Sequence, residues 1–368
     1  MKVVETEIAI IGGGIVGCAT ALNIALRGVP VLLLEKRQPG AAASGVNFGG
    51  VRRNGRAVEE LHLAAKAIEV WKTLPELVGN DCEYSVTGHL KVARTEADMV
   101  AMASHADAQR AYDCHVEMIS ANALRAKYPW FSSLALGAAW CPSDGQANPR
   151  LLGPSFVSAA RSAGAQICEN EPVKRIEKEG DNILLITENN LQVRARQVLN
   201  CAGAWGAQVA GWLGEQIELW PMMPQMAVTE PVPYFLEPAL GVVGGDVYVR
   251  QIPRGNIIFG GRSGTADLKE GFGHALAEEI LCTLQRTAEF IPSLTQTNVI
   301  RMWSGVEGCT PDHLPILGPS HTTKGVFHAF GFSGHGFCLG PGVGATMAEL
   351  LLDGKTDIDL SPFSIDRF

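Results

Sequence analysis

The hydrophobic pattern at the start of the chain predicts a strand, a helix and a second strand. Residues 7–11 form a short apolar run, and residues 15–27 carry apolar side chains at helical spacing. Residues 29–34 form a second apolar run of the kind that lies inside a sheet. Glycines separate the first run from the helix. The pattern therefore predicts a β–α–β unit.

Further along the chain the strict alternation of strands and helices stops. A loop of small residues at 38–55 leads into a helix over about 57–73, and residues 95–130 read as a helix followed by a shorter one. Strands are predicted at about 192–201 and at 326–330, and the latter is followed by glycines and a helix beginning near residue 342. The order of elements predicts an α/β fold that is not a simple doubly wound domain.

Length and composition place the chain among large globular proteins. Its 368 residues are enough for about two domains, and 46% hydrophobic residues can fill a large core. The formal net charge of −8 and the absence of a Lys/Arg cluster argue against a nucleic-acid partner. The longest apolar stretch, residues 8–26, is broken by four glycines, so we expect no membrane span and no signal peptide, and a cytoplasmic location.

The nine cysteines never form a CxxC pair. Zinc sites and iron–sulfur clusters need closely spaced thiolates, so we expect this chain alone to hold no metal. Small buried thiols in a reducing compartment account for the cysteines.

The first glycines have the spacing of a dinucleotide-binding turn. Gly12, Gly14 and Gly17 form GxGxxG between the predicted strand and helix, and Glu35 ends the second strand. The first glycine allows the tight turn, the second lets the backbone approach a pyrophosphate, and the third lets the helix pack closely on the strand. Glu35 can accept hydrogen bonds from the adenosine ribose. The unit predicts binding of an ADP-containing cofactor, either NAD or FAD.

Later segments favour FAD over NAD. Three glycine-rich turns that follow strands, at residues 12–17, 201–205 and 331–336, are spread over the whole chain. If all three converge on one ligand, that ligand is long and buried, as FAD is.

The motifs together resemble the flavoprotein family of amine and amino-acid oxidases that includes sarcosine oxidase, glycine oxidase and D-amino-acid oxidase. The resemblance covers nearly the whole chain and rests on GGGIVG with Glu35, ASGVNFGGVRR, DGQANP, VLNCAGAW, TPDHLPILGP and GFSGHGF. It implies a Rossmann-like FAD-binding domain built from separated segments, 1–75 with 141–225 and 305–368. A substrate domain with an antiparallel sheet (α+β) would comprise 76–140 with 226–304.

The same resemblance implies a set of FAD-contacting residues. These are Gly12, Gly14, Ile15, Gly17, Glu35, Lys36, Arg37, Ala43, Ser44, Asn47, Gly49, Val173, Cys201, Ala202, Gly203, Trp205, Gly305, Phe332, Gly334, His335, Gly336, Phe337 and Cys338. The N-terminus of the last helix would stabilise negative charge on the reduced flavin.

Three positions depart from the family pattern. The cysteine that carries flavin covalently in monomeric sarcosine oxidase is replaced by Gly305, so we expect noncovalent FAD. Cys338 stands where those enzymes have a lysine that holds the substrate carboxylate, and Glu307 stands where glycine and D-amino-acid oxidases have a carboxylate-binding arginine. An acidic residue there would repel a carboxylate but could accept an amine, a guanidinium or a hydroxyl.

A substrate carboxylate then needs another cation. By resemblance to sarcosine oxidase, Arg52 is the expected clamp, and its alternative role is an ion pair between domains. Tyr248 and Arg250 share one face of a predicted strand and form a second candidate pair. His335 is a flavin neighbour by resemblance, or a histidine that only bonds the backbone of its loop.

The electron acceptor and partners are inferred more indirectly. The strand that matches the oxygen-activating lysine of sarcosine oxidase, residues 256–262, has no lysine, which favours a dehydrogenase. The loop ASGVNFGGVRR resembles β-subunits of heteromeric proline or hydroxyproline dehydrogenases and opine oxidases, where a partner subunit can supply FMN or an iron–sulfur centre.

The expected function is oxidation of the C–N bond of a secondary-amine amino acid of opine, proline, hydroxyproline or sarcosine type, with this chain as the catalytic β-subunit of a heteromeric dehydrogenase. Two alternatives stay open. One is a stand-alone glycine or D-amino-acid oxidase that uses dioxygen, and the other is a flavin-bearing subunit without catalysis of its own.

Overall fold

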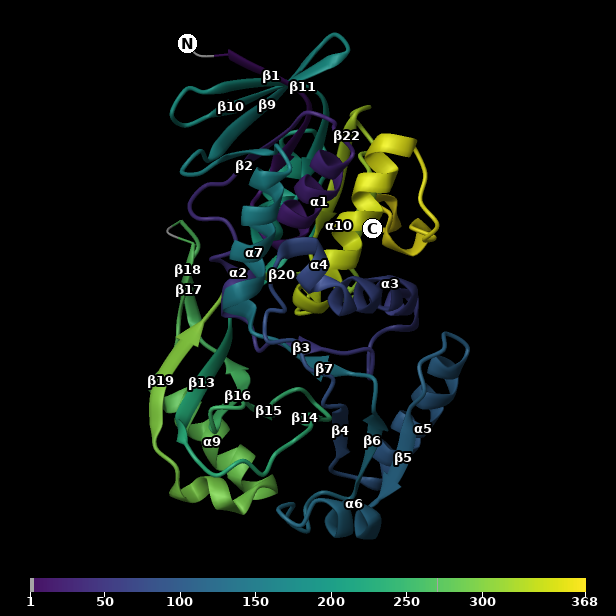
Figure 1. Ribbon diagram of the computed structural model, residues 1–368, viewed down its shortest axis with the longest axis vertical. Coiled ribbons are helices and arrows are strands. Elements are labelled where there is room, and N and C mark those ends of the chain that lie inside the picture. Colours follow the sequence, from purple (N-terminus) through teal and green to yellow (C-terminus); the bar gives the residue numbers. More distant parts are fainter. Residues whose placement is uncertain (1–2, 270) are drawn as a thin grey trace.

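The computed structural model describes residues 3–269 and 271–368 and forms two sheet-based halves stacked along its long axis (Figure 1). Within these residues the helices are α1 (Ile15–Leu26), α2 (Ala43–Val46), α3 (Leu61–Lys72), α4 (Leu74–Val78), α5 (Glu96–Arg110), α6 (Ala121–Lys127), α7 (Pro149–Ser162), α8 (Gly206–Gly211), α9 (Ala277–Phe290) and α10 (Gly336–Asp353).

The upper half is built on a largely parallel sheet. Its order is β21 (Ile316–Pro319), β22 (Val326–Phe330), β11 (Gln192–Asn200), β1 (Val3–Ile11), β2 (Val31–Leu34) and β8 (Gln166–Cys168), with β10 (Asn182–Thr187) and β9 (Val173–Glu179) attached antiparallel to β11. Strands β22, β11, β1, β2 and β8 run parallel, which confirms the predicted α/β class.

The predicted β–α–β unit is confirmed as β1, α1 and β2. The last four residues of β1 are buried and pair in register with the four buried residues of β2. Helices α1, α3, α7 and α10 pack together beside this sheet (Figure 1) and share one hydrophobic core with it. The carboxyl ends of β1 and β2 therefore open toward the lower half.

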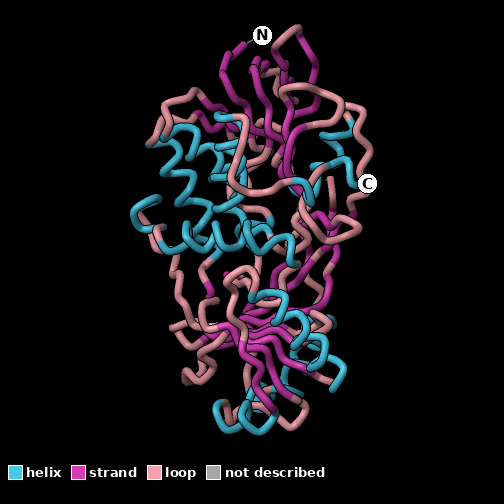
Figure 2. The backbone as a smooth tube through the Cα atoms, turned by 90° about the vertical axis from the view of Figure 1, so that its right-hand side faces the viewer, coloured by secondary structure: helices cyan, strands magenta, loops and turns pink. Residues whose placement is uncertain are grey.

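The lower half contains a mostly antiparallel sheet, as predicted. Its order is β17 (Thr265–Asp267), β18 (Phe272–His274), β19 (Val299–Ser304), β13 (Pro224–Pro231), β16 (Asn256–Ser263), β15 (Tyr248–Gln251), β14 (Ala239–Val242), β4 (His89–Ala93), β6 (Gly137–Cys141) and β5 (Glu117–Ser120). Strands β14 and β4 form its one parallel pair among the described residues. Figure 2 shows this sheet separated from the upper one along the long axis. We propose that these two sheets mark the two domains expected from the sequence.

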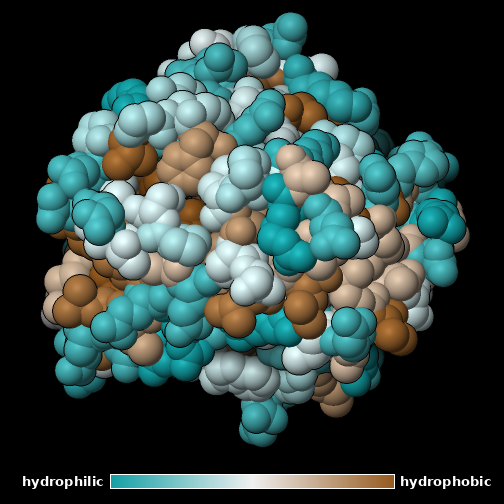
Figure 3. Space-filling model, turned by 90° about the horizontal axis from the view of Figure 1, so that it is seen from below, coloured by the Kyte–Doolittle hydropathy of each residue, from teal (hydrophilic) through white to brown (hydrophobic). Residues whose placement is uncertain are grey.

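Two short ladders connect the halves. They are β3 (Gly50–Val51) with β7 (Gly145–Gln146), and β12 (Trp220–Met222) with β20 (Glu307–Cys309). On the lower end of the molecule, hydrophobic side chains stand in small groups between hydrophilic ones (Figure 3), as on ordinary solvent-facing surfaces.

The last helix begins earlier than the sequence pattern predicts. The pattern places its start near residue 342, but α10 begins at Gly336 and continues through Pro341. Gly340, Gly342 and Gly344 lie inside it, and a Cβ on any of them would come within 2.6 Å of an atom of α1 or α3. These glycines therefore serve close helix packing, although in the sequence they resemble a loop.

Candidate active site

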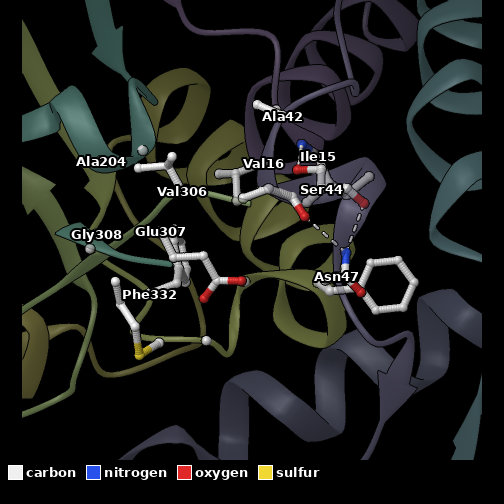
Figure 4. Close-up of a pocket in the computed structure, with 18 of the residues that line it drawn as sticks. Ile15, Val16, Ala42, Ser44, Asn47, Ala204, Val306, Glu307, Gly308 and Phe332 are labelled. Carbon is white, nitrogen blue, oxygen red and sulfur yellow. Dashed lines mark hydrogen bonds between the residues drawn. The ribbon is translucent and has the colours of Figure 1, made fainter. Parts of the chain in front are cut away.

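A cavity of ≈ 1270 Å³ lies between the two halves and is lined by residues of both. The predicted residues that line it are Gly12, Gly14, Ile15, Glu35, Lys36, Arg37, Ala43, Ser44, Asn47, Gly49, Arg52, Val173, Cys201, Ala202, Gly203, Trp205, Tyr248, Glu307, Phe332, Gly334, Gly336, Phe337 and Cys338. Figure 4 shows Ser44 and Asn47 on one wall and Glu307 projecting from the opposite one.

The first glycine turn leaves backbone open to the cavity. Gly12 has φ +104°, and a Cβ there would lie 2.4 Å from the carbonyl oxygen of Cys201. The N-cap residue of α1, Gly14, has no side chain to cap the helix, and the first turn holds no acidic residue. The Glu35 carboxylate accepts hydrogen bonds from the backbone N–H groups of Gly13 (2.7 Å) and Arg37 (2.9 Å), which hold it at the cavity edge. The glycine turn at the start of α1 suits an anion, and the Glu35 carboxylate beside it suits the hydroxyl groups of a polyol.

A hairpin of the lower sheet covers this end of the cavity. Arg37 donates to the carbonyl of Gly271 (2.7 Å) and stacks on Phe272, with 3.8 Å from its guanidinium carbon to the ring centroid. Lys36 lies 3.0 Å above the ring of Trp205, and burial lowers the pKa of Lys36 to about 8. The outer end of the cavity is thus closed by contacts between the halves.

The loop after β2 is held by its own polar side chains. Ser44 Oγ accepts a hydrogen bond from the N–H of Ile15 (2.9 Å), and the Asn47 amide donates to the carbonyls of Ala43 (3.1 Å) and Ser44 (2.8 Å). Asn47 Oδ1 accepts from the N–H of Gly49 (2.8 Å). The loop therefore has a defined shape along the cavity wall.

A second helix N-terminus faces the same space. Helix α10 begins at Gly336 without a side-chain cap, and Gly336, Phe337 and Cys338 line the cavity. Its first N–H groups have no partner within the helix, so they favour a negative charge. The glycine turn before α1, the uncapped N-terminus of α10 and the held carboxylate of Glu35 line one cavity, and together they suit a long ligand that carries phosphates and a second acceptor edge. The residues present fit FAD.

Charged side chains stand at the inner end of the cavity. Glu307 is on β20, and burial raises the pKa of its carboxyl to about 7 although the N–H of Gly334 donates to it. Burial and the nearby Glu307 raise the pKa of Tyr248, whose ring meets that of Phe48 edge to face at 4.9 Å. Arg52 lines the same end, and burial lowers its pKa to about 10.

Behind Arg52 lies a buried chain of polar groups. Arg56 Nε donates to the carbonyl of Arg52 (2.6 Å), its Nη1 lies 3.8 Å from Glu60 Oε2, and His335 Nδ1 is 2.9 Å from Glu60 Oε1. Burial and the positive charge of Arg56 lower the pKa of His335. Burial would raise the pKa of Glu60, but its hydrogen bond with His335 and the cations lower it overall. The pair is therefore an ionised carboxylate beside a neutral imidazole.

The structure does not bring four predicted residues to the cavity surface. Gly17 packs on the first turn, where its Cβ would lie 2.1 Å from the Gly12 oxygen, and His335 is not among the residues that line the cavity. Gly305 has no room for a side chain, since a Cβ would meet Val46 at 2.6 Å.

Arg250 is the fourth and the most consequential. It shares a sheet face with Tyr248, but its long side chain runs to Gln146, with 3.3 Å between Nη1 and Oε1, and reaches the backbone at Gly49. Only 4% of it is exposed, so it supports the loop at Gly49 and does not line the cavity.

Arg56, His89 and Lys91 are among the cavity residues that were not predicted. His89 and Lys91 alternate with the apolar Leu90 and Val92 along β4, so they share the face turned to the cavity. The alternation of polar and apolar residues along β4 is visible in the sequence. The sequence does not show which face of the strand meets the cavity.

Comparisons with known proteins show the family to which the chain belongs. A family model described as "DAO: FAD dependent oxidoreductase" matches residues 7–350. Glycine oxidase of Geobacillus kaustophilus is 28% identical over 98% of this chain and 97% of its own, and its crystal structure matches with a TM-score of 0.91 over 99% of both chains.

Two further relatives are similar over the whole chain. An opine oxidase subunit of Rhizobium meliloti is 27% identical over 99% of this chain and 98% of its own. The crystal structure of L-proline dehydrogenase from P. horikoshii matches with a TM-score of 0.89 and 26% identity, over 99% of this chain and 98% of that one.

Proposed function

The chain belongs to the FAD-dependent oxidoreductase family that its residues match, and we propose that it oxidises the C–N bond of a secondary-amine amino acid. The observation that carries the proposal is a half-buried cation and a half-buried carboxylate, Arg52 and Glu307, that line the same cavity. An amino acid presents the complementary charges, a carboxylate and an ammonium. The predicted residues that line the cavity are proposed to hold FAD without a covalent bond.

Each charged side chain has a distinct task in this proposal. Arg52 binds the substrate carboxylate and so orients the carbon that is oxidised. Glu307 receives the ammonium proton on its carboxylate, and a pKa of about 7 suits a group that takes up a proton near neutral pH. Tyr248 covers the pocket beside Glu307 and helps to exclude water.

FAD, when bound, accepts a hydride from the substrate carbon next to the nitrogen. That carbon loses two electrons, the nitrogen loses its proton, and water hydrolyses the resulting C=N bond to an amine and a carbonyl compound. His335 is proposed as a positioning residue, because its imidazole is fixed by Glu60 and it does not line the cavity.

We also propose that the chain works as the catalytic subunit of a heteromeric dehydrogenase. The similarity to an opine oxidase subunit supports a partner subunit. Among residues 3–269 and 271–368, no group of three or more His, Cys, Asp or Glu could hold a metal ion. The comparisons give no support for additional FMN or iron–sulfur.

No helix in the described part of the chain is long and apolar enough to cross a membrane.

Anaerobic flavin reduction tests the proposal. The FAD-loaded protein is mixed without oxygen with sarcosine, proline, hydroxyproline isomers, octopine, nopaline, glycine and D-alanine, and flavin absorbance is followed. We expect rapid bleaching by a secondary amine and slow return of colour in air. Bleaching by glycine or D-alanine alone, with fast reoxidation and peroxide, would instead establish the stand-alone oxidase that the similarity to glycine oxidase favours. No bleaching by any amine would favour a non-catalytic subunit.

A further inference from the structure

A row of paired residues crosses the lower sheet beneath the inner end of the cavity. Lys91 on β4 pairs with Gly241 on β14, and Gly241 pairs with Tyr248 on β15. Directly paired residues turn their side chains to the same face of a sheet. All three residues line the cavity. The floor of this end therefore carries an ammonium group and a phenol with a glycine between them.

The glycine leaves open space in this row. A Cβ on Gly241 would have one neighbour within 4 Å, His89 Nε2 at 3.8 Å, which is an ordinary contact distance. Gly241 is also outside the left-handed backbone region. The space above Gly241 is thus available to a ligand, and a larger side chain at this position would fill it without backbone strain.

Lys91 and Arg52 lie on either side of Gly55. A Cβ on Gly55 would be 3.8 Å from Arg52 Nη1 and 3.9 Å from Lys91 Cδ. In the part of the chain that the structure describes, neither cation forms an ion pair, and the Arg52 guanidinium donates to the carbonyl of Asn54. The site thus holds two neighbouring cations without an anion between them.

Burial and mutual repulsion both disfavour the charges on Arg52 and Lys91. Burial, and after it the charge of Arg52, lowers the pKa of Lys91 to about 8. Charged groups held out of water without a partner are unfavourable, and a bound anion relieves both the desolvation and the mutual repulsion. A single substrate carboxylate at Arg52 would leave Lys91 unpaired.

We propose that Lys91 binds a second substrate carboxylate in the space above Gly241 while Arg52 binds the first, so that the substrate is a secondary amine carrying a carboxylate on each of its two N-substituents. This inference rests on the proposed function, within which it selects N-carboxyalkyl amino acids over sarcosine and proline. Glu307 then faces the nitrogen between the two carboxylates.

Binding of unreactive analogues tests the second site apart from catalysis. Thiodiglycolate has two carboxymethyl groups on sulfur, whereas methylthioacetate has one, and neither has a nitrogen to oxidise. Their dissociation constants are measured with the FAD-loaded protein from the shift in flavin absorbance. We expect wild-type protein to prefer thiodiglycolate by at least tenfold.

Substitutions then assign that preference to the site. Lys91→Met should reduce the ratio of the two affinities by at least tenfold, Lys91→Arg should keep most of it, and Gly241→Val should lower it by filling the space. Lys355→Met, at an exposed lysine, is the matched control and should keep the wild-type ratio. Flavin content and spectrum confirm that each variant is folded. An unchanged ratio in Lys91→Met, or no preference in wild-type protein, would overturn the proposal.

Flavin reduction separates this proposal from the proposed function. Iminodiacetate and sarcosine differ by one carboxylate, and we expect anaerobic bleaching at lower concentrations of iminodiacetate. If the analogue ratio depends on Lys91 but no secondary amine bleaches the flavin, the proposed reaction is wrong and the second carboxylate site stands. If sarcosine or proline bleaches the flavin and the ratio does not depend on Lys91, the reaction stands and the second site is wrong.

Discussion

Glu307→Gln should make the protein more stable at alkaline pH and leave its stability at acid pH almost unchanged. Burial raises the pKa of Glu307 from 4.5 to about 7. Each pH unit corresponds to about 1.4 kcal/mol, so ionising this carboxyl in the folded protein costs about 3 kcal/mol more than in the unfolded chain. Glutamine has a similar shape and never ionises.

The direction of the pH dependence follows from proton binding. Between pH 4.5 and 7 the folded protein keeps the Glu307 proton that the unfolded chain releases, so stability from this group falls as pH rises through that range and is level above it. For 368 residues the unfolding entropy is about 0.8 kcal/mol per kelvin, so about 3 kcal/mol corresponds to about 4 °C in Tm.

Thermal unfolding of the FAD-loaded protein, followed by circular dichroism from pH 5 to 8, measures the effect. The Tm of Glu307→Gln should exceed that of wild type by about 4 °C at pH 8 and match it at pH 5. Glu117→Gln, at an exposed glutamate, is the control and should track wild type throughout. A difference that stays constant with pH, or grows toward acid pH, would refute an elevated pKa at Glu307.

The other predictions concern FAD, the substrate and the buried polar chain. Gly12→Ala places a Cβ 2.4 Å from a backbone oxygen at φ +104°, so it should lose FAD on desalting, seen as a fall of flavin absorbance per protein by more than tenfold. Arg52→Met should raise KM for the substrate amine by at least tenfold, whereas Arg250→Met should change KM by less than about twofold, because Arg250 does not line the cavity; equal effects would contradict this distinction. Glu60→Gln, which leaves the buried Arg56 without its carboxylate partner, should destabilise the protein by about 3 kcal/mol, measured as a fall in Tm, and an unchanged Tm would show that the pair contributes little.

The residues at the proposed cofactor end of the cavity could be identified from the sequence alone. Gly12, Gly14 and Glu35 have their roles because a tight turn, close backbone approach and a carboxylate after β2 are local requirements. Such local requirements demand particular residue types at a constant spacing, and this spacing is visible in the amino-acid sequence. The β–α–β unit was likewise predictable from hydrophobic periodicity, whereas the antiparallel lower sheet was predictable from the family resemblance.

Only the tertiary structure decided which side chains meet at the substrate end. Lys91 lies beside Gly241 and Tyr248 because β4 pairs with β14, which is far from it in sequence, in a particular register, and no local pattern encodes that register. Arg250 is a second example. It shares a sheet face with Tyr248, yet its side chain runs to Gln146 and to the backbone at Gly49. The alternation along the strand does not show this direction. Local chemistry determined the glycine turn and the carboxylate that are proposed to hold FAD, while strand pairing and packing decided which charges meet at the proposed substrate end.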